Sequence, residues 1–276
     1  MGGGADEAKA RGVSDGLFSL DVGALDFSVS HSTRVGCALS TDATLFELFA
    51  DLPAQTNFLT QLIFALGVYG PLIGFLISAP KRTGSFFGHV RPSQAAIFLA
   101  IPLAVALPGA LIGALSGYFD GARASFAAVA LYFVSNLVTS GSEEFGWRGF
   151  LYPYFKEGGK SFWNASWKSG LIWAVWHYPL MLILYWGLGP AALVSTLAGF
   201  TASIVAMAYI SNFVYERTQS IALCILLHAL NNTISFTVAL FFPLASYGLL
   251  LGIASWVVVA ILDKANQPQA KSAQGT

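Results

Sequence analysis

Seven long apolar stretches follow residue 56, and they constrain the fold more than any other feature of the sequence. Each holds enough residues, or nearly enough, to cross roughly 30 Å of hydrocarbon as a helix that rises about 1.5 Å per residue. Three prolines, Pro71, Pro102 and Pro108, fall inside these stretches, where neighbouring groups must bond the carbonyls that each proline frees. The predicted spans cover residues 57–79, 93–119, 122–140, 167–187, 190–214, 220–240 and 245–262.

The composition indicates that lipid is the surrounding solvent. Only 10% of the 276 residues are charged and 55% are hydrophobic, whereas soluble domains carry about 25% charged residues. Lysine plus arginine and aspartate plus glutamate each number 14, so no basic excess points to nucleic acid as a partner. The predicted fold class is therefore all-α, a polytopic transmembrane helical bundle of seven spans, or of eight if one further span is hidden.

Three regions follow from this pattern. Residues 1–55 hold eight acidic residues and three basic ones. They contain no stretch of the roughly 20 apolar residues that a span requires, so we expect an acidic, partly disordered extension. Residues 56–265 form the predicted transmembrane domain, and residues 266–276 form a polar tail.

The distribution of positive charge predicts the orientation in the membrane. With seven spans, the segments 80–92, 141–166 and 215–219 and the C-terminus face the same side. By the positive-inside rule this side is the cytoplasm, so we expect a multi-pass protein of the cell membrane with its acidic extension outside. An eighth span would move only the N-terminus to the other side. The residues that mark the cytoplasmic side are Lys81, Arg82, Arg91, Arg148, Lys156, Lys160, Arg217, Lys264 and Lys271.

Two adjacent glutamates and an arginine directly follow one apolar helix. Glu144 and Arg148 are separated by four residues and share a helical face, so they can form an ion pair. Glu143 is rotated by about 100° from Glu144 and must face something else. A salt bridge that caps a helix at the membrane interface would explain the same pattern. The aromatic neighbours Phe145 and Trp147 argue against a simple solvated face.

Two histidines lie inside later apolar spans. His177 occupies the middle of its span, and His228 shares a helical face with Asn232, four residues further on. Ionisable side chains within spans are costly, face the protein interior and by default indicate a functional site. The structural alternatives are a buried histidine bonded to a carbonyl, and hydrogen bonds from Asn and His that hold two helices together.

A compact bundle could bring these side chains together around a water molecule. A carboxylate in a low-dielectric site can take a proton from water, while imidazole and amide donors stabilise an oxyanion. Alternatively, Glu143, His177 and His228 could hold a divalent metal such as zinc that acidifies the water. The HExxH motif of the usual zinc-protease helix is absent from the sequence. The residues do not decide whether the protein uses a divalent metal or no cofactor.

Taken in order, the three motifs resemble those of the CPBP family. This family comprises CAAX prenyl proteases and bacteriocin-processing or immunity proteins, also called Abi. The resemblance covers a core at about residues 125–240, and a tryptophan stands where the family usually has a phenylalanine, which is a conservative aromatic change. The matching motifs are Glu143-Glu144-xxx-Arg148, Trp173-xxx-His177 and His228-xxx-Asn232.

This resemblance implies an intramembrane endopeptidase that hydrolyses a peptide bond near the membrane. The charge distribution predicts that its site is reached from the cytoplasmic face. The resemblance also implies that Glu143 is the general base acting on water and that His177 helps to hold this water. His228 and Asn232 would polarise the scissile carbonyl and stabilise the oxyanion, and the predicted ion pair would support the site. The expected substrate is a peptide or a membrane protein, prenylated or not.

Two other functions fit the same residues. A proton- or ion-coupled transporter would also place Glu, His and Arg within spans as a proton relay. Many transporters show two related halves, and no such symmetry is visible here. The other alternative is a non-catalytic immunity or scaffold protein of the membrane, because function belongs to the site and not to the fold.

Overall fold

The computed structural model describes residues 58–78, 86–117, 119, 126–185, 189–242 and 247–273. All regular secondary structure in these residues is helical, which confirms the predicted all-α class. The acidic extension predicted for residues 1–55 lies outside the described residues.

A described helix occupies each of the seven predicted span positions. The second span is divided at Ala100 into two helices, and the last helix continues from its predicted span into the predicted polar tail. The elements are α2 (Phe58–Ser78), α3 (Pro92–Leu99), α4 (Ile101–Leu115), α5 (Phe126–Gly146), the π-helical turn η1 (Trp147–Leu151), α6 (Tyr152–Lys156), α7 (Phe162–Tyr185), α8 (Pro190–Thr218), α9 (Ile221–Phe241) and α10 (Tyr247–Ala273).

Four helical segments of the described chain are long and apolar enough to cross a membrane. Large apolar side chains project from the outside of the bundle: Leu115 and Phe126, for example, are 88% and 90% exposed. Such outward apolar surfaces are expected where lipid replaces water. These features fit an integral membrane protein. The four segments are Pro92–Leu115, Pro190–Thr218, Ile221–Phe241 and Gly248–Asn266.

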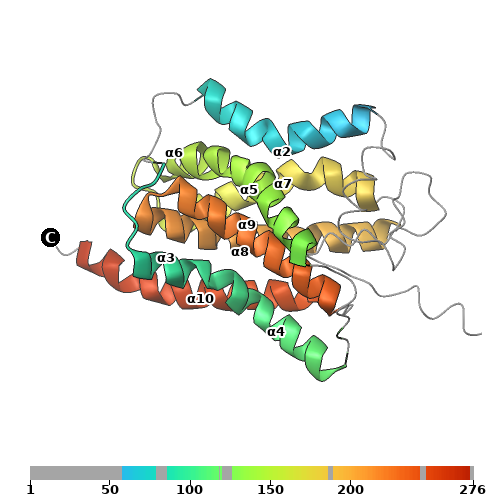
Figure 1. Cartoon of the computed structure of the whole chain (residues 1–276). Helices are drawn as coiled ribbons and strands as arrows, with labels where there is room; N and C mark the ends of the chain where they lie inside the picture. The colour runs from blue at the N-terminus through green and yellow to red at the C-terminus, as the bar shows by residue number, and fades with distance from the viewer. Residues whose placement is uncertain are drawn as a thin grey trace, which may run out of the picture.

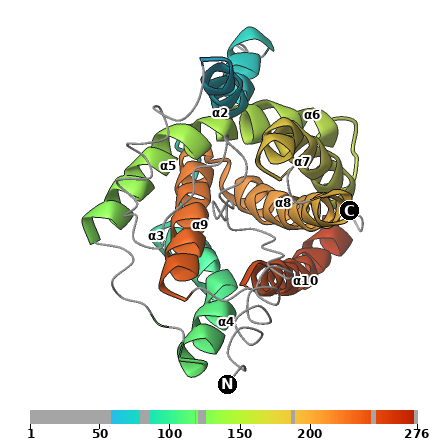
Figure 2. The ribbon, with the colours of Figure 1, turned by 90° about the vertical axis from the view of Figure 1, so that its right-hand side faces the viewer.

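The helices form one bundle with an additional helix laid across one side. Helix α5 packs on α9, α7 packs on α8, and α10 packs on both α8 and α4 (Figure 2). Helix α2 lies outside this group, over α5 and α7 (Figures 1 and 2). Helix α2 thus covers part of the two helices that carry the first and second motifs.

The loops predicted to share one side of the membrane meet at one end of the bundle. The backbone N–H of His89 donates to the carbonyl oxygen of Thr218 at 2.7 Å. The Tyr152 hydroxyl donates to Glu216 Oε1, also at 2.7 Å. Burial and the neighbouring Glu216 carboxylate raise the pKa of the Tyr152 phenol, so the hydroxyl remains the donor. The segment before α3, the residues that follow η1 and the C-terminal end of α8 thus lie together, as the single-sided arrangement requires.

The proline inside α2 is accommodated by a hydrogen bond from another helix. Pro71 has no N–H and cannot bond the carbonyl of Gly67, four residues earlier. The indole Nε1–H of Trp176 in α7 donates to this carbonyl oxygen at 2.7 Å. The freed carbonyl is therefore bonded by a neighbour, as expected for a proline within a membrane span.

Helix α2 approaches α5 at a position where only glycine fits. A Cβ atom on Gly146 would lie 2.6 Å from the Pro71 carbonyl oxygen and 2.8 Å from its carbonyl carbon. Both atoms belong to the backbone of a buried residue, so they cannot move aside as a flexible side chain could. The absence of a side chain at Gly146 sets the distance at which α2 covers α5.

Replacing Gly146 with alanine is expected to destabilise the protein by roughly 1–3 kcal/mol, because the added methyl forces the two helices apart. Unfolding in mixed detergent micelles measures this difference. The matched control is Gly74→Ala in α2, where an added Cβ has no neighbour within 4 Å. Equal effects of the two substitutions would contradict the packing described here.

Candidate functional site

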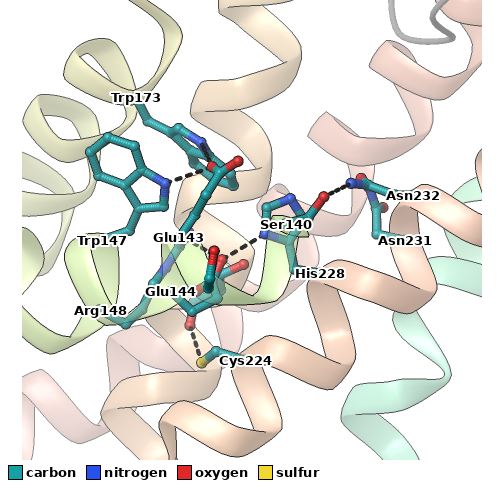
Figure 3. Close-up of polar contacts among 12 residues, drawn as sticks. Ser140, Glu143, Glu144, Trp147, Arg148, Trp173, Cys224, His228, Asn231 and Asn232 are labelled. Carbon is teal, nitrogen blue, oxygen red and sulfur yellow. Dashed lines mark hydrogen bonds and ion pairs between the residues drawn. The ribbon is translucent and has the colours of Figure 1, made fainter. Parts of the chain in front are cut away.

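The first and third motifs meet where α5 packs on α9, and their contacts pair the two helices in antiparallel order (Figure 3). His228 Nδ1 bonds Glu144 Oε1 at 2.8 Å. One turn earlier in α5 and one turn later in α9, Asn232 Nδ2 donates to Ser140 Oγ at 3.0 Å. The four-residue spacing is therefore repeated on both helices, and His228 and Asn232 share one face, as their spacing predicted.

Glu144 and Arg148 form a buried ion pair. The distance between Arg148 Nη1 and Glu144 Oε1 is 2.9 Å, and the two side chains are 1% and 0% exposed. The same carboxylate oxygen takes the bond from His228. The guanidinium of Arg148 also lies 4.6 Å from the ring centroid of Trp173. The predicted pairing is thus confirmed, and its burial excludes a solvated cap on the helix.

This pair leaves polar atoms inside the protein without a bond. Among the described residues, Glu144 Oε2 and the Nε and Nη2 atoms of Arg148 have no hydrogen-bond partner. Unpaired buried donors and acceptors are costly and are uncommon in native structures. These unpaired atoms can therefore bond further polar groups that come close to the ion pair.

Among the residues that the structure describes, Glu143 is held by neutral donors and not by a cation. The indole N–H groups of Trp147 and Trp173 both donate to Glu143 Oε2, at 2.9 and 3.0 Å (Figure 3). Glu143 retains an exposed fraction of 6%, whereas Glu144 has none. Glu143 is therefore the carboxylate of the pair that can touch a molecule entering the site.

A π-helical turn follows the two glutamates directly. It covers Trp147–Leu151 and adds one residue to the helical turn before α6 begins. Trp147 and Arg148, at its start, still lie four residues after their carboxylate partners and bond them. Such turns within helices are frequent at functional sites, and nothing in the sequence pattern indicated this one.

His177 lies one helical turn after Trp173 in α7. Its Nδ1 lies 2.9 Å from the Trp173 carbonyl oxygen. Because a carbonyl only accepts, Nδ1 carries a proton, and Nε2 is the acceptor of the neutral ring. The bond to a carbonyl is the arrangement that the structural alternative predicted. In the described part of the chain, His177 is linked to Glu143 through Trp173 and not by a direct bond.

Asn232 is part of a polar network with two residues that the sequence reasoning did not single out. Its Nδ2 donates to Asn136 Oδ1 at 3.2 Å and to Ser140 Oγ at 3.0 Å. Asn136 Nδ2 donates in turn to the Tyr132 carbonyl, which fixes the orientation of its amide. Both N–H bonds of Asn232 are therefore used within the protein. The signal in the sequence was spacing: Asn136 and Ser140 lie four residues apart on an apolar helix, eight and four residues before Glu144.

The described residues contain no group of three or more His, Cys, Asp or Glu side chains placed to hold a metal ion. Of the three conditional metal ligands, Glu143 accepts two indole bonds and His228 bonds Glu144, while His177 bonds a backbone carbonyl. The structure thus does not gather Glu143, His177 and His228 into a ligand set.

A bundle of apolar helices that encloses two carboxylates, an arginine and a histidine defines a helical membrane protein with a polar site in its interior. Residues 124–234 match the family model described as type II CAAX prenyl endopeptidase Rce1-like, which is a protease family. This match is consistent with the CPBP family and confirms the resemblance based on the three motifs, all of which lie within the matched segment. No curated protein matches the chain.

Proposed function

We propose that the protein is a membrane-embedded endopeptidase in which Glu143 activates water for hydrolysis of a peptide bond. The observation that supports this most is that two adjacent carboxylates have different kinds of bonding partner. Arg148 and His228 bond Glu144, so its charge is balanced by basic groups. Glu143 is bonded by neutral indoles and keeps its charge available to take a proton.

The proposed reaction needs only water and the peptide. Glu143 takes one proton from water while the water oxygen forms a bond to the scissile carbonyl carbon, and the carbonyl electrons move to its oxygen. When this tetrahedral intermediate collapses, the C–O double bond re-forms and the C–N bond breaks. The proton held by Glu143 passes to the leaving nitrogen. The carboxylate is regenerated, and a carboxylic acid and an amine are the products.

His228 is proposed to stabilise the oxyanion with its second ring nitrogen. Its Nδ1 is engaged with Glu144, which leaves Nε2 for substrate. The proposed mechanism uses the form of His228 that carries a proton on both ring nitrogens. A protonated His228 donates from Nε2 to the developing negative oxygen.

Asn232 and His177 have auxiliary roles in the proposed mechanism. The amide of Asn232 can add a second donor to the oxyanion if it exchanges its bond to Ser140 for one to substrate. The Nε2 atom of His177, an acceptor in the neutral ring, can take a hydrogen bond from the attacking water. Both roles place neutral groups around the charge that forms during the reaction.

The proposed membrane arrangement follows from the predicted spans and charges. Seven spans would cross the cell membrane, with the end of the bundle that carries His89, Tyr152 and Thr218 on the cytoplasmic side. The substrate would then be a peptide or membrane protein that reaches Glu143 from this side. Because the matched family description names CAAX prenyl endopeptidases, a peptide with a prenylated C-terminal CaaX sequence is the first substrate class to test.

Cleavage by the purified protein in liposomes tests this proposal. A farnesylated CaaX peptide and the same peptide without its farnesyl group are incubated with the protein, and the released fragments are identified by mass spectrometry. Cleavage of either peptide supports an endopeptidase, and preference for the farnesylated one supports the prenylated class. Proton-coupled uptake into the liposomes, without cleavage and lost on changing His177 or His228, would favour a transporter instead.

Removal of divalent metals is expected to leave the cleavage rate unchanged, because the proposed proton transfer uses Glu143 directly. The protein is dialysed against a chelator, its metal content is measured, and cleavage of the same peptide is timed before and after dialysis. Loss of activity that returns on addition of zinc would contradict the direct mechanism. Such a result would show that Glu143, His177 and His228 rearrange to bind a metal ion.

A further inference from the structure

We propose that Trp147 and Trp173 are positioning residues for Glu143, and that they act through their indole N–H groups. This inference rests on the proposed role of Glu143 as general base. Neither tryptophan touches substrate in this scheme. Together they fix the carboxylate in the orientation from which it takes the proton of water.

The two indoles reach the carboxylate from different helices. Trp147 lies one turn after Glu143 at the start of η1, and Trp173 lies in α7. Both N–H groups bond the same oxygen, Oε2, at 2.9 and 3.0 Å. Two donors on one oxygen, anchored on separate helices, prevent the carboxylate from rotating, and they leave Oε1 as the oxygen for water.

The indole of Trp173 contacts three charged or ionisable side chains of the site. Its N–H bonds Glu143, its ring lies against the Arg148 guanidinium at 4.6 Å, and its ring centroid is 5.2 Å from that of His228. A phenylalanine could supply both ring contacts but not the N–H. The packing role and the hydrogen-bonding role of Trp173 can therefore be separated by experiment.

Trp176, in the same helix as Trp173, is an example of an indole with a purely structural role. Its N–H donates to the backbone carbonyl of Gly67, which Pro71 leaves free. This bond ties α7 to α2 and involves no ionisable group. In contrast, Trp147 and Trp173 donate their N–H groups to Glu143, which is the more accessible of the two adjacent carboxylates.

Removing each N–H without removing the ring tests the proposal. Trp173→Phe and Trp147→Phe are each expected to lower kcat for the cleaved peptide about tenfold or more, the worth of one hydrogen bond to a charged group. KM is expected to stay unchanged, because the bonds act on the base and not on substrate binding. Incorporation of benzothienylalanine at position 173, which keeps the fused ring and lacks the N–H, is expected to reproduce the fall in kcat.

Trp167→Phe is the matched control. Trp167 lies on the same helix, is 48% exposed, and undergoes the same chemical change away from the site. It is expected to leave kcat and KM unchanged. If benzothienylalanine at position 173 retained the wild-type kcat, or if kcat and KM changed together, the positioning role would be overturned.

A spectroscopic measurement tests the bonds independently of activity. In protein labelled with 15N at the indole nitrogens, the N–H signals of Trp147 and Trp173 are assigned from the two phenylalanine variants. Both are expected to shift upfield in Glu143→Gln, where the accepting oxygen loses its charge, while the Trp167 signal stays in place. Unmoved signals would overturn the proposed contacts even if one variant failed to fold. If the signals move but Glu143→Gln still cleaves peptide, the proposed function fails while the contacts stand.

Discussion

Replacement of Glu143 with glutamine is expected to lower kcat for peptide cleavage by about a hundredfold to ten-thousandfold, the usual contribution of a general base. Glutamine has nearly the same shape as glutamate, and its amide oxygen can still accept the bonds from Trp147 and Trp173. Its amide cannot take a proton from water. The variant should therefore insert and fold like the wild type and yet fail to cleave.

The measurement is the cleavage rate of the purified variant in liposomes, together with its unfolding midpoint in detergent. Glu157→Gln provides a control with the same chemical change at an exposed position beyond η1. It should retain the full rate. If the Glu143 variant is folded and retains the wild-type rate, the assignment of this residue as general base is wrong.

Replacement of Glu144 with glutamine is expected to destabilise the protein by roughly 3–5 kcal/mol, the cost of breaking a buried ion pair from one side. The substitution leaves the guanidinium of Arg148 buried without its carboxylate, at an exposed fraction of 1%. It also removes the charged partner of His228 Nδ1. Loss of activity in this variant should accompany loss of the fold, in contrast to the Glu143 variant.

Unfolding in mixed micelles measures this effect, and Lys156→Gln is the control. Lys156 pairs with Glu216 at 3.6 Å, but both side chains are about one-third exposed, at 33% and 37%. Solvent screens such a pair, so its loss should cost roughly 0–1 kcal/mol. Similar effects of the two substitutions would show that solvent reaches Glu144.

The sequence predicted the helices well, because their signal is local. The span expected at 57–79 is the helix Phe58–Ser78, and the span expected at 220–240 is the helix Ile221–Phe241. The pairing of Glu144 with Arg148 was predictable for the same reason, since both residues lie within one helical turn of each other. Spacing along a single helix decided each of these features.

Contacts between helices were harder to predict from the sequence. Replacement of phenylalanine by Trp173 was interpreted as a conservative aromatic change, but its indole N–H bonds Glu143 in α5. The bonds of Asn232 to Asn136 and Ser140 were missed in the same way. Which face of one helix meets which face of another depends on packing in three dimensions, and the periodicity of a single helix does not specify it.

The π turn adds one residue between the glutamates and α6 without redirecting the helix that follows. A turn of this kind is an α-helical turn with one residue inserted, and its greater width takes up the added residue. Deletion of one residue would therefore restore a regular helix and leave the segment after it close to its present orientation. The Tyr152 hydroxyl would keep its place beside Glu216. Related chains can therefore be expected to differ in length by one residue in this segment and still place the same side chains around the site.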